Sequence, residues 1–217
     1  MVARMRAGEE AEREEEEKEA VERFLGGPCA FAAGASAAGR GNLSAVMAEW
    51  AKFDAGALRG VPSVGVEEAA ALMEAPGRRT VVVDCRGADE QDVSMIPGSL
   101  RQAQVDALPG PARRELLVGE GTTVVAACTI GYRSGKYVEK LRAEFGDAVD
   151  ARNLRGSLLA WSHAGRPLTD GLDPARPSAR LHTYGKAWAL PPDGIEAVYH
   201  AKGAKGWTAW LASWLVR

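Results

Sequence analysis

Two short apolar runs place the strongest constraint on how this chain can fold. Residues 80–84 read TVVVD and residues 122–127 read TTVVAA, and the second run leads directly into Cys128. Continuous runs of this kind, rich in β-branched residues, are typical of strands buried on both faces of a parallel sheet. Helical patterns over 67–74 and 134–145 flank them. The alternation of strands and helices predicts an α/β fold with a mostly parallel sheet.

Weaker patterns supply the remaining expected elements and the domain boundaries. Short strands are expected over 61–66 and 148–154, and a short helix over 156–163. Asn42 is a good N-cap residue for a leading helix. Four segments follow from this pattern: an acidic tail and small-residue linker (1–41), the leading helix (42–59), the main domain (60–168) and a C-terminal extension (169–217).

Composition excludes several classes of protein. The net charge of −2 gives no overall field that points to nucleic acid or an anionic membrane, and nucleic acid is not expected as a partner. No run of 18 or more apolar residues occurs, so no membrane-spanning helix is expected. Three Cys in 217 residues are too few for a disulfide framework and predict a reducing compartment, either the cytoplasm or an organelle such as a plastid or mitochondrion. The three His are scattered, so no metal site is expected.

The segment from Cys128 to Ser134 carries the strongest chemical signal. It joins a buried strand to a predicted helix, which Ser134 is expected to cap. Backbone N–H groups in such a loop converge on the cysteine sulfur, and the helix N-terminus and Arg133 add positive charge. Both effects favour the thiolate, so the pattern predicts a nucleophilic Cys128. Gly131 suits a position that requires a positive φ. The alternative is a buried structural cysteine at a strand end.

These residues, with four other marks in the same order, resemble the rhodanese family. Cys128-Thr129-Ile130-Gly131-Tyr132-Arg133 resembles the family's six-residue active-site loop. The other marks are Asp84-Cys85-Arg86 followed by Glu90, Ile96-Pro97-Gly98-Ser99, the run from Leu154 to Trp161, and Gly165-Arg166-Pro167-Leu168. The resemblance covers about residues 60–168. Departures are Ser94-Met95 where Gly-His is usual, the stretch 91–93, and Ser157 in place of a glycine, which we regard as a mild change.

The resemblance implies a sulfurtransferase with a mostly parallel five-stranded sheet. Cys128 would take a sulfur atom from thiosulfate or a similar anionic donor and pass it, as a persulfide, to cyanide or a thiol. No cofactor is implied, because the persulfide carries the sulfur. Arg133 would orient the donor anion, and the implied substrate-binding residues of the loop are Thr129, Ile130, Gly131, Tyr132, Arg133 and Ser134.

The resemblance also implies a scaffold near this loop. Arg86 and Glu90 would form a structural ion pair. Asp84 lies at the strand end, where its carboxylate is expected to accept hydrogen bonds from nearby loop amides. Cys85 and Cys128 fall at the same edge of the sheet, which raises the hypothesis of a redox-sensitive disulfide. Because successive strand side chains point to opposite faces, Cys85 would point away if Asp84 faces the active-site loop, and a free, buried Cys85 is the default expectation.

Two other activities were weighed against sulfur transfer. Cysteine phosphatases place Arg six residues after the nucleophile, where this chain has Ser134. A nucleotide-binding P-loop would need a glycine in place of Ile130 and Ser or Thr in place of Tyr137. A non-catalytic rhodanese-like binding or scaffolding module stays open as the alternative to an enzyme.

The C-terminal extension holds two further features. Trp207, Trp210 and Trp214 fall on one predicted helical face within residues 203–217. This helix is expected either to dock on the domain or to contact a partner protein or a membrane surface. Upstream, residues 170–192 are expected to form an extended connection, in which the stretch from Tyr184 to Trp188 packs near the active site or the sheet edge.

Overall fold

The computed structural model describes residues 35–38 and 42–200. The acidic tail and the predicted Trp-bearing helix lie outside the described residues. A five-stranded sheet organises the described part, in the spatial order β2-β6-β5-β3-β4, with every pair of neighbours parallel. Its strands are β2 (Ser63–Val64), β6 (Asp150–Leu154), β5 (Thr122–Ala127), β3 (Arg79–Asp84) and β4 (Leu100–Arg101). The predicted α/β class and five-stranded parallel sheet are confirmed.

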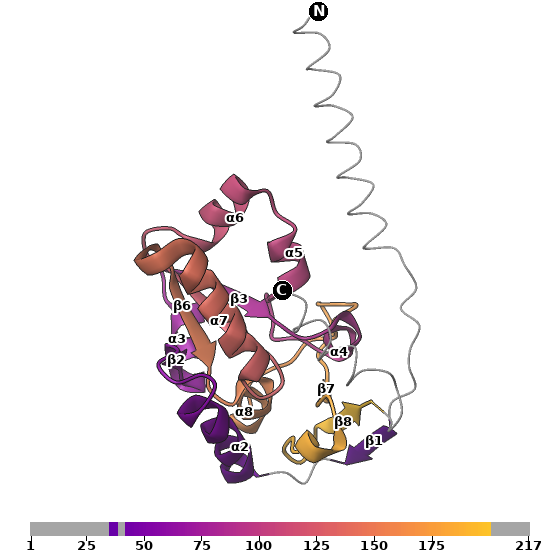
Figure 1. Ribbon diagram of the computed structural model, residues 1–217. Coiled ribbons are helices and arrows are strands. Elements are labelled where there is room, and N and C mark those ends of the chain that lie inside the picture. Colours follow the sequence, from indigo (N-terminus) through magenta and orange to yellow (C-terminus); the bar gives the residue numbers. More distant parts are fainter. Residues whose placement is uncertain (1–34, 39–41, 201–217) are drawn as a thin grey trace, which may run out of the picture. The chain divides into compact units, whose positions relative to one another are not determined.

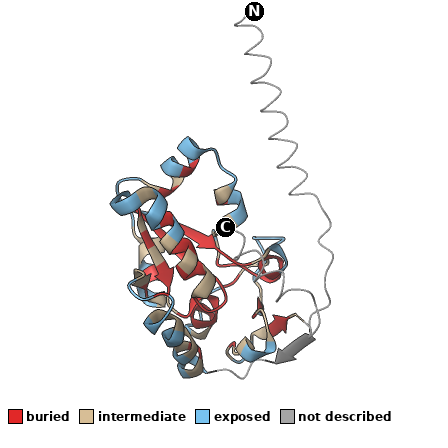
Figure 2. Ribbon diagram, in the orientation of Figure 1, coloured by how far each residue is buried: buried red, intermediate tan, exposed pale blue. Residues whose placement is uncertain are grey.

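The two central strands are the apolar runs that the sequence singled out. Val82 and Val125 pack on one face of the sheet, and Val83 and Val124 pack on the other. Both faces are therefore covered, and Figure 2 shows the central strands as buried. This explains why the runs lack polar alternation.

Helices cover each face of this sheet (Figure 1). One face carries α2 (Leu43–Ala55), α3 (Val66–Glu74) and α8 (Ser157–His163). The other face carries α5 (Gln102–Asp106), α6 (Gly110–Leu117) and α7 (Tyr132–Phe145). The short helix α4 (Ala88–Val93) follows β3. Asn42 caps α2 as expected, since its Oδ1 accepts from the Ala45 amide at 2.7 Å.

A second sheet was not expected from the sequence. Its order is β1-β8-β7, formed by β1 (Ala35–Ala38), β8 (Glu196–Tyr199) and β7 (Arg180–His182). The strand β8 pairs antiparallel with β1 and parallel with β7. The prediction of an extended connection over 170–192 is wrong for this part, because β7 forms a ladder with β8. A 3-10 turn, Lys186–Trp188, lies between these two strands.

No helix among residues 42–200 is long and apolar enough to cross a membrane.

Candidate active site

The loop that starts at Cys128 leaves the carboxyl end of β5 and enters α7. Gly131 sits at its tightest point, with φ +113°. A Cβ atom at this position would come within 2.7 Å of Cδ1 of Trp50. The left-handed backbone and the close contact both require glycine, which confirms the expectation for Gly131.

The Cys128 sulfur is buried in a set of hydrogen-bond donors. The Gly131 amide lies 3.1 Å from Sγ, and the Ser134 hydroxyl lies 3.4 Å from it. Burial of the side chain, which is 2% exposed, raises the pKa of the Cys128 thiol. The charge of Arg133 and the hydrogen bonds from Ser134 and Gly131 lower that pKa by more, so the net shift favours the thiolate.

Ser134 does not cap the helix, so that prediction is wrong. Helix α7 begins at Tyr132, because the left-handed Gly131 already turns the chain into the helix. Ser134 is therefore inside the first turn, and its Oγ lies 2.7 Å from Oδ1 of Asn153 as well as near Cys128. The Ser134 hydroxyl therefore hydrogen-bonds to the Cys128 sulfur rather than to a free amide at the helix N-terminus.

Two neighbouring residues were missed by the sequence reasoning. Asn153, on β6, donates from Nδ2 to the Gly131 carbonyl at 2.9 Å and so fixes the loop from the side. Ser157 accepts a hydrogen bond from the Cys128 amide at 2.6 Å, with a left-handed φ of +53°. The signal for Asn153 was its position at the carboxyl end of a strand beside β5. Ser157, which stands where the family has a glycine, therefore contacts the Cys128 backbone directly.

The expected ion pair between Arg86 and Glu90 does not form. Arg86 folds back onto its own strand end, where its Nη2 lies 2.7 Å from Oδ2 of Asp84. The Asp84 carboxylate also accepts from the Arg86 amide at 3.0 Å, which confirms the expected contact with a loop amide. Glu90 instead accepts hydrogen bonds from both Nη atoms of Arg133, at 2.5 and 2.8 Å.

The ion pair with Arg133 explains why the Glu90 carboxyl has a lowered pKa. Burial raises the pKa of this carboxyl, but the charge of Arg133 and its hydrogen bonds lower it well below its usual range. Nη2 of Arg133 also donates to the Thr129 hydroxyl at 3.1 Å. The cation that faces the loop is therefore held in place by groups from two elements.

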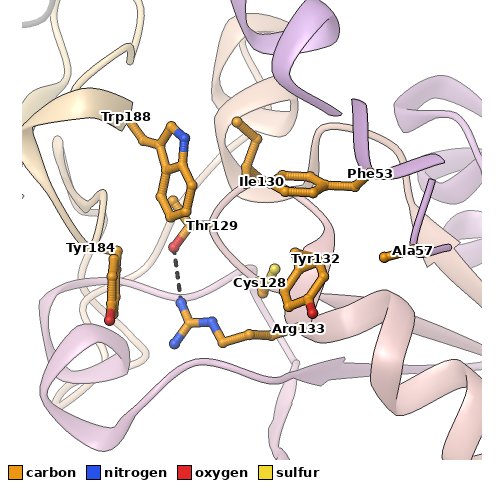
Figure 3. Close-up of a pocket in the computed structure, with 9 residues that line it drawn as sticks. All are labelled: Phe53, Ala57, Cys128, Thr129, Ile130, Tyr132, Arg133, Tyr184 and Trp188. Atoms are coloured by element: carbon orange, nitrogen blue, oxygen red, sulfur yellow. Dashed lines mark hydrogen bonds between the residues drawn. The ribbon is translucent and has the colours of Figure 1, made fainter. Parts of the chain in front are cut away.

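A pocket opens above the cysteine, with a volume of about 440 Å³ (Figure 3). The predicted substrate-binding residues Thr129, Ile130, Tyr132 and Arg133 line it together with Cys128, whereas Gly131 and Ser134 contact the sulfur instead. The other lining residues come from elsewhere in the chain: Phe53, Ala57, Tyr184 and Trp188.

Tyr184 and Trp188 confirm the expectation that their segment packs near the active site. Their rings lie 5.9 Å apart, and the Trp188 ring lies 6.5 Å from that of Phe53. Phe53 in turn lies 5.1 Å from Tyr132. Figure 3 shows Tyr184 and Trp188 on one side of the loop residues and Phe53 and Tyr132 on the other. The pocket is therefore walled by aromatic rings.

The second cysteine lies close to the first. Both are free thiols, and both belong to the apolar cluster on the α7 side of the sheet. The default expectation of a free, buried Cys85 is confirmed, and Cys85 lies on the same side of the sheet as Cys128. The Cys85 amide donates to the Ala127 carbonyl at 2.7 Å, and each cysteine directly follows the last paired residue of β3 or β5, so the two occupy adjacent positions just beyond neighbouring strands. Burial, then Cys128 and Asp84, raise the pKa of Cys85 well above its usual range, so it stays a neutral thiol.

The histidines are less scattered than the sequence indicates. His182 and His200 lie with ring centroids 4.5 Å apart, and Nδ1 of His182 is 3.7 Å from Oε1 of Glu90. His163 is half-buried, with Nε2 2.8 Å from the Leu190 carbonyl. No group of His, Cys, Asp and Glu side chains in the described part of the chain is arranged to hold a metal ion.

Comparison with known proteins points to one family. Residues 65–164 match the family model described as "Rhodanese-like domain". No curated protein sequence matches the chain.

Several solved structures are similar to part of the chain. A thiosulfate sulfurtransferase from Pseudomonas aeruginosa is 26% identical, with a TM-score of 0.44, over 58% of this chain and 23% of that protein. A rhodanese-like domain protein from Staphylococcus aureus is 26% identical, with a TM-score of 0.35, over 48% and 94% of the two chains. A rhodanese-related protein from Thermoplasma volcanium is 18% identical, with a TM-score of 0.39, over 50% and 97%.

Proposed function

Residues 65–164 of this chain form a rhodanese-like domain, and from that premise we propose that the protein is a sulfurtransferase that carries sulfur as a Cys128 persulfide. One observation supports this most. The Cys128 sulfur lies 3.1 Å from a backbone amide and 3.4 Å from a hydroxyl, with an arginine that lowers its pKa. A buried structural cysteine needs none of these contacts.

The first step is sulfur uptake from an anionic donor such as thiosulfate. The Cys128 thiolate attacks the outer sulfur of the donor. A new S–S bond to Cys128 forms, the S–S bond within thiosulfate breaks, and sulfite leaves with the bonding electron pair. The Gly131 amide and the Ser134 hydroxyl then stabilise the negative charge on the persulfide.

Arg133 supplies the positive charge on the pocket wall. Its guanidinium draws the sulfonate end of the donor, although Glu90 offsets part of its charge. Thr129, Ile130 and Tyr132 shape the entrance around the donor. Arg86 and Asp84 bind each other and act only on the shape of the loop.

The second step returns the enzyme to its starting state. A thiophilic acceptor, either cyanide or a thiolate, attacks the outer sulfur of the persulfide. The bond between that sulfur and Cys128 breaks, and the Cys128 thiolate is the leaving group. No oxidant, reductant or cofactor enters this cycle.

Intact-mass spectrometry after thiosulfate treatment tests the proposal. The protein should gain one sulfur atom, which cyanide removes as thiocyanate. Cys128→Ser should abolish the gain, while the matched variant Cys85→Ala should keep it, since Cys85 is a neutral thiol outside the pocket. A thermal unfolding curve for each variant shows whether it is folded. A folded wild-type protein that takes up no sulfur and releases no thiocyanate would instead support the non-catalytic binding or scaffolding module.

A further inference from the structure

We propose that the sulfur acceptor of this enzyme is an organic thiol with an apolar body about the size of one aromatic ring, bound between the aromatic walls of the pocket. This inference rests on the proposed function and adds the chemical class of the second substrate. It makes Phe53, Tyr184 and Trp188 the residues that determine acceptor specificity.

The aromatic walls come from segments outside the rhodanese-like domain. Phe53 lies on α2, and Tyr184 and Trp188 lie between β7 and β8, so all three are outside the domain at 65–164. The loop that holds the sulfur needs none of them for its hydrogen bonds. They place apolar surface over Cys128 that sulfur uptake itself does not require.

The pocket is much larger than cyanide or thiosulfate. The volume of about 440 Å³ falls in the range of pockets that bind organic ligands. Cyanide or thiosulfate alone would leave most of this space, and most of the ring surface, in contact with water. A ring-sized body would fill the space and remove that apolar surface from water.

The pocket wall carries little charge. Among residues 42–200, Arg133 is the one charged residue that lines the pocket, and both of its Nη atoms are already bound to Glu90. Its guanidinium also lies 5.3 Å from the centre of the Tyr184 ring. The wall around Cys128 therefore carries one cation, and Glu90 offsets part of its charge. A thiol with several carboxylates would lose solvation there and could pair at most one of them with this cation.

The transfer step balances with such an acceptor. The acceptor enters as its thiolate, having given its proton to water. Its sulfur attacks the outer sulfur of the Cys128 persulfide, a new S–S bond forms on the acceptor, and the bond to Cys128 breaks. The products are an organic persulfide anion and the Cys128 thiolate.

The test measures how fast a preformed Cys128 persulfide is discharged by different thiols. Benzyl mercaptan is compared with 2-mercaptoethanol, which lacks the ring, by quenched-flow mixing and intact mass. For the wild-type protein the rate constant should be larger with benzyl mercaptan by roughly tenfold or more, the effect of burying one ring-sized apolar group.

Two variants show whether the walls cause this preference. Trp188→Ala should bring the ratio of the two rate constants close to one, and Trp188→Phe should restore much of it. Leu172→Ala removes an apolar side chain that is 69% exposed and outside the pocket, and should keep the wild-type ratio. Equal rates in the wild-type protein, or an unchanged ratio in Trp188→Ala, would overturn the proposal.

Failure of the proposed function is distinguishable from failure of this inference. If thiosulfate loads no persulfide, sulfur transfer is wrong, and the walls are tested by alkylation of Cys128 with N-benzyl iodoacetamide against iodoacetamide. A faster reaction with the benzyl reagent, lost in Trp188→Ala, would support an aromatic ligand at this pocket. The absence of any difference would refute it.

Discussion

Both Nη atoms of Arg133 donate to the carboxylate of Glu90, and these two residues come from different helices, α7 and α4. Glu90 is 2% exposed, so the carboxylate depends on this partner for its charge balance. The pair joins the start of the active-site helix to the loop after β3.

Removing only Arg133 from this ion pair should lower the free energy of unfolding more than changing both residues. Arg133→Ala leaves a buried carboxylate without its cation, and we expect the free energy of unfolding to fall by about 3–5 kcal/mol. The double variant Arg133→Ala/Glu90→Gln should recover part of this loss, because the amide is neutral. Urea unfolding of the three proteins measures the difference. A double variant no more stable than Arg133→Ala would contradict the dependence of Glu90 on Arg133.

The same pair predicts a loss of stability in acid. The pKa of Glu90 in the folded protein is lower than its unfolded value of about 4.3. Its contribution is therefore fully present above that pH and is lost as the pH falls through the folded pKa. Glu90→Gln removes this titration, so the gap in unfolding free energy between wild type and variant should shrink as the pH falls from about 7 to about 3. A gap that stays constant over this range would show that Glu90 does not titrate as described.

Ser134→Ala should make Cys128 a weaker acid. Its hydroxyl contributes to the lowered pKa of the thiol, so the rate of alkylation by iodoacetamide should follow a pH profile shifted upward by about 1–2 pH units. The control is Ser162→Ala, which removes a buried hydroxyl that bonds to the Leu159 carbonyl on α8. Superimposable profiles for Ser134→Ala and wild type would remove Ser134 from the thiolate site.

The two contributions of Ser157 can be separated by a pair of substitutions. Ser157→Ala and Ser157→Gly both take the acceptor away from the Cys128 amide. Only glycine relieves the left-handed backbone, at φ +53°. Ser157→Gly should therefore be more stable than Ser157→Ala by about 1 kcal/mol in urea unfolding. If Ser157→Ala is as stable as Ser157→Gly, the backbone at position 157 carries no strain.

The central sheet was predictable because burial on both faces leaves a clear pattern. The run 122–127 matches the strand β5 residue for residue, and Cys128 follows it as expected. Helix α7 starts at Tyr132 rather than Ser134, since a left-handed glycine can begin a helix without a side-chain cap. The second sheet was not predictable. Its strands are short, and β1 and β8 pair across almost the whole described chain, which no local pattern reveals.

The placement of Cys128 in a tight strand-to-helix loop was predictable, but the contacts of the side chains around it were not. Strand-to-helix geometry identified Cys128 and Gly131 from sequence alone. The partner of Glu90 depends on where α4 packs, and nearness in sequence wrongly favoured Arg86. The aromatic walls depend on chain segments far from the loop, so they too required the three-dimensional arrangement.

The catalytic loop and the aromatic walls of the pocket come from different segments of the chain. The groups that hydrogen-bond to the sulfur or the amide of Cys128 come from residues 131–157, whereas Phe53, Tyr184 and Trp188 come from either side of that stretch. On the proposed assignment, the chemistry of the reaction and the choice of recipient are encoded in different parts of the gene. Substitutions in the flanking segments would then redirect the sulfur to a new molecule while the catalytic loop stays unaltered, so the recipient can evolve independently of the reaction.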